Sequence, residues 1–188
     1  MTRIISGFAG SLALRVPRSG TRPTSDRTRE GIFSALVARD AIDEARVLDL
    51  YAGSGALGLE AVSRGATSAV LVDRSHDAAT VCRRNAQIVL KAAPAPSALS
   101  IEVAARPVLG FLEHASAEWD LVFIDPPYEV DEAEIAAVLT HLGPRLAPDS
   151  TVVLERSTRS PAPAWPDGYH PQRSREYGET AVYFATTD

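Results

Sequence analysis

The sequence has a single cysteine and no long hydrophobic run. Cys82 has no partner for an internal disulfide, so nothing indicates an oxidising compartment, and we expect a cytoplasmic protein. The absence of a run of about 18 apolar residues excludes a membrane-spanning helix. Aromatic residues are only 6% of the 188 residues, whereas 45% are hydrophobic and 23% charged, which excludes collagen-like, disordered and disulfide-rich classes. We expect one globular domain that is monomeric and does not engage a membrane.

The sequence also lacks a metal-binding pattern. Its four histidines are scattered, and neither H-x-x-x-H nor C-x-x-C occurs. Such spacings bring metal ligands together on one helix or loop. We therefore predict that no residue of this chain binds a metal.

The N-terminal residues include an apolar stretch. Residues 4–14 have the length of a signal-peptide apolar region, but Arg15 follows directly and no A-x-A cleavage site is present. Two short apolar runs, residues 3–6 and 11–16, flank a glycine-containing turn at residues 7–10. This pattern predicts a β-hairpin rather than a signal peptide.

Positive charge is concentrated at the N-terminal end. The chain has a net charge of −5, but residues 1–30 carry +4 and the remainder −9. A bias toward Arg over Lys explains the residue type but not this clustering, which is typical of an arm that contacts phosphates. We predict a hairpin extension over residues 1–25 and a main domain over residues 26–188. The six clustered arginines are Arg3, Arg15, Arg18, Arg22, Arg27 and Arg29.

Apolar strands alternate with helical segments through the main domain. The expected strands are residues 46–50, 69–73, 100–104, 120–125 and 151–155, and the expected helices are 26–39, 56–64, 75–91, 107–114 and 131–142. The helix at 75–91 is expected to begin at a Ser75 N-cap. Near-continuous apolar strands indicate a parallel sheet covered on both faces, so the pattern predicts a Rossmann-like, doubly wound α/β fold. Because no helix precedes the strand at 180–185, we expect it to be antiparallel and to pair with a short strand near 172–176. The sheet would then be seven-stranded and mostly parallel.

A glycine-rich loop follows the first strand of the main domain. Gly53, Gly55 and Gly58 satisfy G-x-G-x-x-G between a strand and a helix, where glycines let a ligand approach the backbone. The loop fits a dinucleotide pyrophosphate, and it equally fits the adenosine and amino-acid parts of S-adenosylmethionine.

Two aspartates flank this loop. Asp73 ends the next strand, where a carboxylate binds the ribose hydroxyls of either cofactor. Asp49, four residues before the first glycine, would repel a pyrophosphate but bind the cationic amino group of a methionine moiety. Asp49 therefore favours S-adenosylmethionine. As alternatives, Asp49 caps the adjacent turn and Asp73 caps the next helix.

A second motif, Asp125-Pro126-Pro127-Tyr128, ends the fourth strand at the sheet edge where α/β proteins bind ligands. The prolines remove two backbone donors and leave carbonyl and carboxylate acceptors. An exocyclic amino group could donate to Asp125 and to the Pro126 carbonyl while Tyr128 stacks on the base. Positioning and electrostatic stabilisation would then supply most of the acceleration. A simple turn is the alternative.

Together these residues resemble a known family. The glycine loop with Asp49, the acidic Asp73 and D-P-P-Y resemble class I S-adenosylmethionine-dependent methyltransferases that modify exocyclic amino groups. Four further segments resemble the RsmD-type 16S rRNA guanine-N2 methyltransferases of bacteria, so the resemblance spans nearly the whole chain. They are residues 3–7 (RIISG), 22–30 (RPTSDRTRE), 49–60 (DLYAGSGALGLE) and 177–180 (YGET).

The resemblance implies methyl transfer from S-adenosylmethionine to N2 of guanine 966 of 16S rRNA, in the small ribosomal subunit or an assembly intermediate. The implied catalytic residues, which hold the target base, are Asp125, Pro126, Pro127 and Tyr128. The implied cofactor-binding residues are Asp49, Ala52, Gly53, Ser54, Gly55, Asp73, Arg74 and Arg106. The implied RNA-binding residues are Arg3, Arg15, Arg18, Arg22, Thr24, Arg27 and Arg29. Such enzymes often place an acidic or amide side chain after the third strand to bind adenine. This chain has Ala104-Ala105-Arg106-Pro107, so that role falls to backbone groups or to Arg106.

Three other functions fit part of the sequence. An adenine-N6 DNA methyltransferase would share the cofactor residues and D-P-P-Y, but the 60 residues after Tyr128 leave little room for a target-recognition domain. A non-catalytic RNA-binding module of ribosome assembly would have no evident use for the three aspartates. An NAD-dependent oxidoreductase is disfavoured by Asp49 and by the lack of a hydride-transfer acid or base beside D-P-P-Y.

Overall fold

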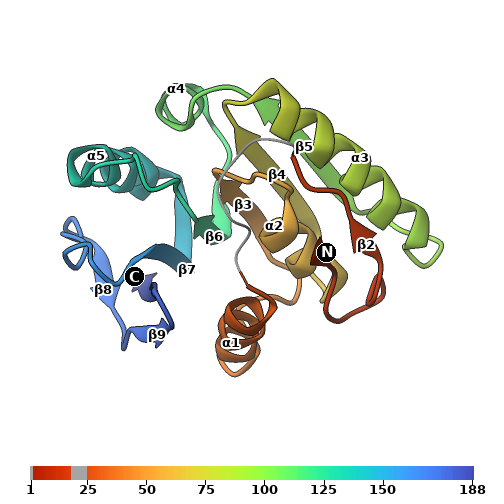
Figure 1. The fold of residues 1–188 in the computed structure, drawn as a ribbon, viewed down its shortest axis with the longest axis horizontal. Helices are drawn as coiled ribbons and strands as arrows, with labels where there is room; N and C mark the ends of the chain where they lie inside the picture. The colour runs from red at the N-terminus through yellow and green to blue at the C-terminus, as the bar shows by residue number, and fades with distance from the viewer. Residues whose placement is uncertain (1, 18–24) are drawn as a thin grey trace.

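The computed structural model describes residues 2–17 and 25–188 of the chain (Figure 1). The α-helices are α1 (Asp26–Val37), α2 (Ala56–Ser63), α3 (His76–Ala92), α4 (Val108–His114) and α5 (Glu132–Leu142), and the 3-10 helix η1 spans Gly143–Arg145. The strands are β1 (Thr2–Arg3), β2 (Ala13–Leu14), β3 (Arg46–Leu50), β4 (Ser68–Asp73), β5 (Ser100–Ala105), β6 (Trp119–Ile124), β7 (Leu146–Ser157), β8 (Tyr169–Pro171), β9 (Arg175–Tyr177) and β10 (Thr180–Thr187). None of the helices in the described part of the chain is long and apolar enough to cross a membrane.

The main sheet has the strand order β5-β4-β3-β6-β7-β10-β8, with β9 also paired to β10. The strands from β5 to β7 are parallel, and β10 is antiparallel to β7. The chain reverses its direction of travel across the sheet between β3 and β6, so the crevice outside the carboxyl ends of these two strands is the expected ligand site of an open α/β sheet.

The predicted doubly wound α/β fold, mostly parallel with an antiparallel last strand, is confirmed. The described sheet has eight strands rather than seven because the strand expected near residues 172–176 is divided in two. Pro171 of β8 pairs with Ala185 of β10, and Arg175 of β9 pairs with Val182 of β10. The segment between Pro171 and Arg175 is therefore one residue longer than the β10 segment between Val182 and Ala185. An extra residue on one strand is a β-bulge, which interrupts regular pairing.

Helices cover both faces of the sheet. Side chains of α1, α2 and α3 share one core with alternate strand residues such as Val47, Leu71 and Phe123. The intervening residues, Leu48 and Ile124 among them, face α4 and α5 in a second core. Because side chains alternate along a strand, the face that any strand-end residue occupies follows from its position. Figure 1 shows α4 and α5 on the opposite side of the sheet from α2 and α3.

The predicted N-terminal hairpin is present and packs against α2. Its paired strands are shorter than the apolar runs at 3–6 and 11–16, because the amides of Ile5 and Ser6 donate to the carboxylate of Glu60 (2.6 and 3.0 Å) instead of to a partner strand. The amide of Phe8 donates to the Ser63 carbonyl at 2.9 Å. At Gly7 an added Cβ would lie 1.7 Å from that carbonyl oxygen, so only glycine fits this close approach.

Glu60 holds this hairpin and is fully buried. Its carboxylate also pairs with Arg64 at 2.7 Å. We expect Glu60→Ala to lower the free energy of unfolding by about 3 kcal/mol, because it leaves two amides and a guanidinium without their acceptor. Hydrogen exchange should show faster exchange at the amides of Ile5 and Ser6. The exposed Glu30→Ala on α1 is the matched control, and equal exchange in both variants would contradict this anchoring role.

Candidate active site

The glycine loop lies between β3 and α2. Tyr51, Gly53 and Gly55 all have positive φ (61°, 56° and 76°), which winds the loop tightly before α2 begins at Ala56. A Cβ at Gly58 would lie 2.5 Å from the Leu71 side chain, so this glycine allows α2 to pack closely on β4. The loop has the strand-to-helix position that the sequence predicts.

Asp49 lies behind the loop and is 1% exposed. Its Oδ2 accepts a hydrogen bond from the amide of Gly58 at 2.9 Å. The pKa of Asp49 is raised to about 7, chiefly by burial; the hydrogen bond from the Gly58 amide lowers it, and the negative charges of Asp125 and Asp73 add to the rise. The three predicted site aspartates thus lie close enough to interact.

Asp73 ends β4 and holds the loop. Its Oδ2 accepts from the amide of Gly53 at 2.9 Å, and its Oδ1 accepts from the amide of Ser75 at 2.8 Å. The N-cap of α3 is Ser75, as predicted, and its hydroxyl accepts from the amide of Ala78. Asp73 therefore fixes the loop and the turn before α3, and contact of this carboxylate with a ribose stays a prediction.

The charges at this edge suit a cationic ligand. Asp49, Asp73 and Asp125 lie at this edge and interact through their charges. The negative potential they create would repel a pyrophosphate and attract the sulfonium and ammonium groups of S-adenosylmethionine. Ala105 pairs with Asp73 across β4 and β5, so the exposed Arg106 follows at the same edge. Arg74 is also exposed there. These residues are chemically suited to the predicted cofactor.

D-P-P-Y follows β6 at the same edge of the sheet. Asp125 and Pro126 are half-buried, whereas Tyr128 is 72% exposed, an unusual position for a large ring. The Pro127 carbonyl accepts the amide of Val130 at 3.0 Å and closes the turn. Pro127 is therefore a structural part of the motif, and the other three residues face a pocket.

That pocket has a volume of about 310 Å³. Its walls come from segments far apart in the sequence: the start of α1, the end of β7 and the turn between β9 and β10. The lining residues are Ser25, Thr28, Asp125, Pro126, Tyr128, Glu155, Arg156, Ser157, Ser160, Tyr177, Gly178, Glu179 and Thr180. The sequence predicted the wall formed by D-P-P-Y but not most of the other lining residues. Two signals were available, since YGET belongs to the family motifs and Glu155 ends a predicted strand.

Comparison with known proteins identifies the family. The family model described as Conserved hypothetical protein 95, which represents the RsmD-type methyltransferases, matches residues 2–186. The chain belongs to this family. Its sequence is 33% identical over 180 residues to Ribosomal RNA small subunit methyltransferase D of Escherichia coli K12. The matched residues cover 95% of this chain and 86% of that protein. The Haemophilus influenzae protein of the same name is 34% identical over 162 residues, covering 85% and 80%.

Solved structures agree with this assignment. YhhF from Escherichia coli superposes with a TM-score of 0.85 at 29% identity, covering 100% of this chain and 98% of that one. Magnesium protoporphyrin IX methyltransferase from Synechocystis PCC 6803, solved with bound S-adenosylmethionine, has a TM-score of 0.66 at 15% identity, covering 90% and 87%, and shares the fold alone. The resemblance to RsmD-type methyltransferases and the predicted cofactor, S-adenosylmethionine, are confirmed.

In this RsmD-type chain, α3 connects the N-terminal extension to the glycine loop. Asn85 is fully buried, and its Nδ2 donates to the carbonyls of Ser54 (2.8 Å) and Arg15 (2.9 Å) while its Oδ1 accepts from the Arg15 amide (2.9 Å). The buried Cys82, also on α3, donates to the carbonyl of Gly53 at 3.3 Å. The sequence pattern did not predict this role of Asn85, because a single polar residue within a helix can equally lie on the solvent-exposed face.

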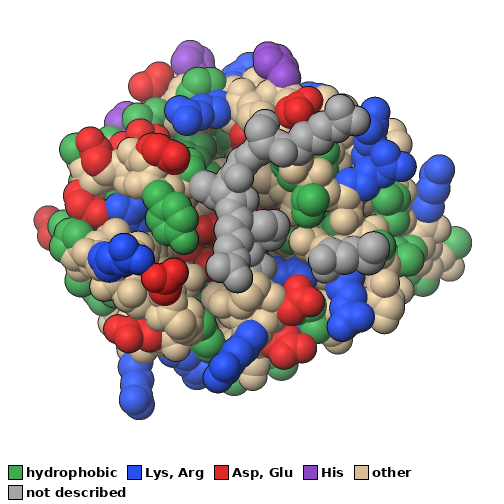
Figure 2. Space-filling view, viewed as in Figure 1, with side chains coloured by type: hydrophobic (Ala, Val, Ile, Leu, Met, Phe, Trp, Pro, Cys, Tyr) green, Lys and Arg blue, Asp and Glu red, His purple; other side chains and the backbone are tan. Residues whose placement is uncertain are grey.

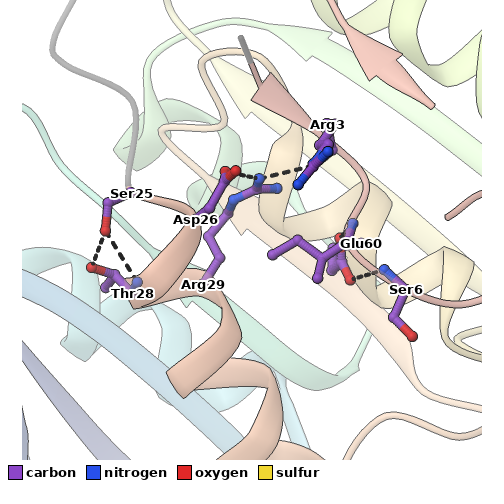
Figure 3. A network of polar contacts seen from close by, with 8 residues as sticks. Arg3, Ser6, Ser25, Asp26, Thr28, Arg29 and Glu60 are labelled. Carbon is purple, nitrogen blue, oxygen red and sulfur yellow. Dashed lines mark hydrogen bonds and ion pairs between the residues drawn. The ribbon is translucent and has the colours of Figure 1, made fainter. Parts of the chain in front are cut away.

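The predicted RNA-binding residues divide into three groups. Arg3, Arg15 and Arg27 are exposed. Arg29 is 1% exposed and donates to Asp26 (2.7 Å) and to the Arg3 carbonyl (2.8 Å), as Figure 3 shows. The prediction that Arg29 contacts RNA is corrected, because its guanidinium joins α1 to the hairpin. The predicted residues Arg18, Arg22 and Thr24 lie outside the described residues.

Within residues 2–17 and 25–188, no group of His, Cys, Asp and Glu side chains could hold a metal ion. Asp49 and Asp73 accept hydrogen bonds from backbone amides, among them those of Gly58 and Gly53.

Proposed function

We propose that this protein transfers a methyl group from S-adenosylmethionine to the exocyclic N2 of a guanine in the rRNA of the small ribosomal subunit. The relatives named Ribosomal RNA small subunit methyltransferase D support rRNA as the substrate. The observation that carries the proposal is the position of Asp125. It interacts with the cofactor-site aspartate Asp49 and also lines the 310 Å³ pocket, so a base in that pocket lies beside the cofactor loop.

The chain supplies binding groups for each part of the cofactor. Asp49 and the loop at Gly53 and Gly55 would hold the amino-acid end, Asp73 the ribose hydroxyls, and the strand end at Ala105 the adenine. When bound, S-adenosylmethionine supplies an activated sulfonium methyl group. The enzyme therefore needs to position an acceptor rather than to activate the methyl donor.

The pocket would hold the target base by its amino group. Asp125 and the Pro126 carbonyl accept its two N–H bonds, which orients the nitrogen lone pair, and the exposed ring of Tyr128 stacks on the base. As positive charge develops on N2, the Asp125 carboxylate stabilises it and accepts the proton that leaves. Asp125 acts late in the reaction and need not be a strong base.

We further propose that residues 1–25 form the RNA-binding arm. The exposed Arg15 and the proposed cofactor loop are both bonded to Asn85, whose side chain donates to the carbonyls of Arg15 and Ser54. Figure 2 shows Lys and Arg side chains gathered over the region of β2 and α3 in the same view as Figure 1.

Replacing Arg3, Arg15 and Arg27 together with Ala should flatten the salt dependence of RNA binding. Each lost phosphate contact reduces the slope of log K against log salt by about 0.7–0.9, so the slope should fall by about 2. Filter binding across a salt series measures it. Lys91→Ala is the control, because this exposed residue lies at the end of α3 distant from the site. A slope that the triple variant leaves unchanged would place the RNA elsewhere.

Transfer of labelled methyl from S-adenosylmethionine into small subunits that lack the modification tests the proposed function. Digestion to nucleosides should place the label in N2-methylguanosine at a single site. Label in N6-methyladenosine of DNA would favour the adenine-N6 alternative. Binding of RNA without transfer to any substrate, with cofactor binding intact, would favour the non-catalytic module.

A further inference from the structure

Tyr51 has an unusual backbone conformation at the start of the glycine loop. It follows the last residue of β3 with a φ of 61°, a left-handed conformation that glycine adopts freely and that costs a residue with a side chain free energy. Such strain persists only where the surrounding structure holds it, and it is common at functional sites. Gly53 and Gly55 meet the same demand without a side chain. A tyrosine at this position therefore indicates a use for its side chain.

The left-handed conformation of Tyr51 accompanies a change of face. Along β3, Val47 lies in the core on the α1–α3 side, whereas Leu48 and Leu50 lie in the core on the α4–α5 side. Continued alternation would return residue 51 to the α1–α3 side. The Tyr51 side chain instead packs against the α4–α5 core, on the same side as Leu50. The glycine loop thus places one side chain on the side of the sheet that α5 covers.

The Tyr51 hydroxyl reaches the first turn of α5, where it donates to Oε1 of Glu134 at 2.9 Å. Burial raises the pKa of Tyr51, and the hydrogen bond to Glu134 raises it further, so the hydroxyl stays a donor at neutral pH. The charges of Arg74 and Arg156 lower this pKa. Arg74 follows Asp73 at the edge proposed for the cofactor, and Arg156 lines the pocket. Tyr51 is therefore close enough to interact with a charge in each region.

The first turn of α5 is also joined to D-P-P-Y. The Val130 amide closes the D-P-P-Y turn by donating to the second proline carbonyl at 3.0 Å, and the Val130 carbonyl accepts from Arg156 at 3.0 Å. The Arg156 guanidinium pairs with the carboxylate of Glu132, which lies in the same helical turn as Glu134. The hydrogen bond from Tyr51 to Glu134 therefore links the glycine loop to the segment that carries D-P-P-Y.

Strand pairing alone does not fix these two segments relative to each other. The parallel pairing of β3 with β6 extends as far as Leu50 and Ile124. The glycine loop and D-P-P-Y both begin beyond this pair. Their relative position therefore depends on contacts made past the strand ends, and the hydrogen bond between Tyr51 and Glu134 is such a contact.

We propose that Tyr51 is a positioning residue that aligns the two halves of the active site through its hydrogen bond to Glu134. Methyl transfer needs the sulfonium methyl and the acceptor amine in line, and a displacement of about 1 Å costs about 10²-fold in rate. The assignment rests on the proposed function, in which the glycine loop holds the methyl donor and D-P-P-Y holds the acceptor. Tyr51 takes no proton and acts through Glu134.

Tyr51→Phe keeps the ring and removes the hydroxyl. Single-turnover methyl transfer into small subunits, with enzyme and S-adenosylmethionine saturating, should slow by about 10- to 100-fold, because the reactants are bound but poorly aligned. The Kd values for S-adenosylmethionine and for the subunit should each change by less than about threefold, since the groups proposed to bind them remain.

Variants of Glu134 test whether the effect passes through this contact. Glu134→Ala should match Tyr51→Phe, and the double variant should be no slower than either, because each change removes the same hydrogen bond. Glu134→Gln should recover most of the rate that Glu134→Ala loses, since its Oε1 still accepts from the hydroxyl. Additive losses in the double variant would overturn the assignment.

Tyr169→Phe is the matched control. The Tyr169 hydroxyl also donates to α5, but to the Leu139 carbonyl near the other end of the helix, at 2.7 Å. This variant loses a comparable hydrogen bond, so it should lower stability and keep the wild-type transfer rate. A wild-type rate in Tyr51→Phe, an equal loss in Tyr169→Phe, or a loss of cofactor affinity that accounts for the slower rate would overturn the positioning role alone. Wild-type enzyme that transfers no methyl group to small subunits would overturn the proposed function and the assignment with it.

Discussion

Replacing Asp125 with Ala should abolish methyl transfer while leaving the affinity for S-adenosylmethionine nearly unchanged. Asp125 lines the proposed base pocket, whereas the amides of Gly53 and Gly58 donate to Asp73 and Asp49 instead. Loss of a carboxylate that orients the nucleophile and stabilises its developing charge costs about 10²–10⁴ in rate. Asp125→Asn should show most of this loss, since an amide keeps the shape but not the charge.

Single-turnover methyl transfer and calorimetric titration of the cofactor measure the two effects separately. Asp131→Asn is the matched control, because Asp131 caps α5 by accepting from the amide of Glu134 at 2.8 Å. Asparagine caps a helix as well as aspartate, so this variant should keep full activity. A fully active Asp125→Ala enzyme would rule out the proposed role of D-P-P-Y.

The sequence predicted the parts of the fold whose signals are local. Apolar runs alternating with helical periods located the parallel strands to within a residue or two at most ends, as at β3 and β4. The glycine loop and the Ser75 cap were predicted because positive φ and helix N-caps have strong residue preferences. Each of these features depends on residues that are close in the sequence.

Features that depend on distant residues were not predictable in the same way. The pocket joins Thr28, Asp125 and Tyr177, which only the strand order brings together. Arg29 has the same charge as its exposed neighbour Arg27, and only the packing of α1 against the hairpin shows that it is buried. The division of β8 from β9 likewise depends on the length of the facing strand β10.

Asp49→Asn should stabilise the free protein at pH 8 and weaken its binding of S-adenosylmethionine. The pKa of Asp49 is about 7 in the folded protein, against 3.8 ordinarily, so folding favours its protonated form. The stability that this proton contributes is fully present below about pH 4 and is lost as the pH rises through 7. The neutral amide avoids that loss, which is on the order of 4 kcal/mol at pH 8, and it can still accept the Gly58 amide.

Chemical denaturation of both proteins from pH 4 to pH 8 measures this effect, and the difference in unfolding free energy should fall toward zero at pH 4. Asp120→Asn provides a control of opposite sign. The hydrogen bonds from Arg46 hold the pKa of Asp120 below its usual value, so that variant should lose stability at neutral pH, and its loss should shrink in acid.

Cofactor binding supplies the second half of the test. A cationic ligand favours the ionised form of Asp49, so wild-type protein should release protons on binding S-adenosylmethionine near pH 6.5, and its affinity should rise with pH through 7. Calorimetry in buffers of different ionisation enthalpy detects that release, which Asp49→Asn should lack. An Asp49→Asn variant that is less stable than wild type at pH 8, or that binds the cofactor equally well, would contradict this account. The expected result is that the buried charge lowers the stability of the free enzyme and is neutralised when the cofactor binds.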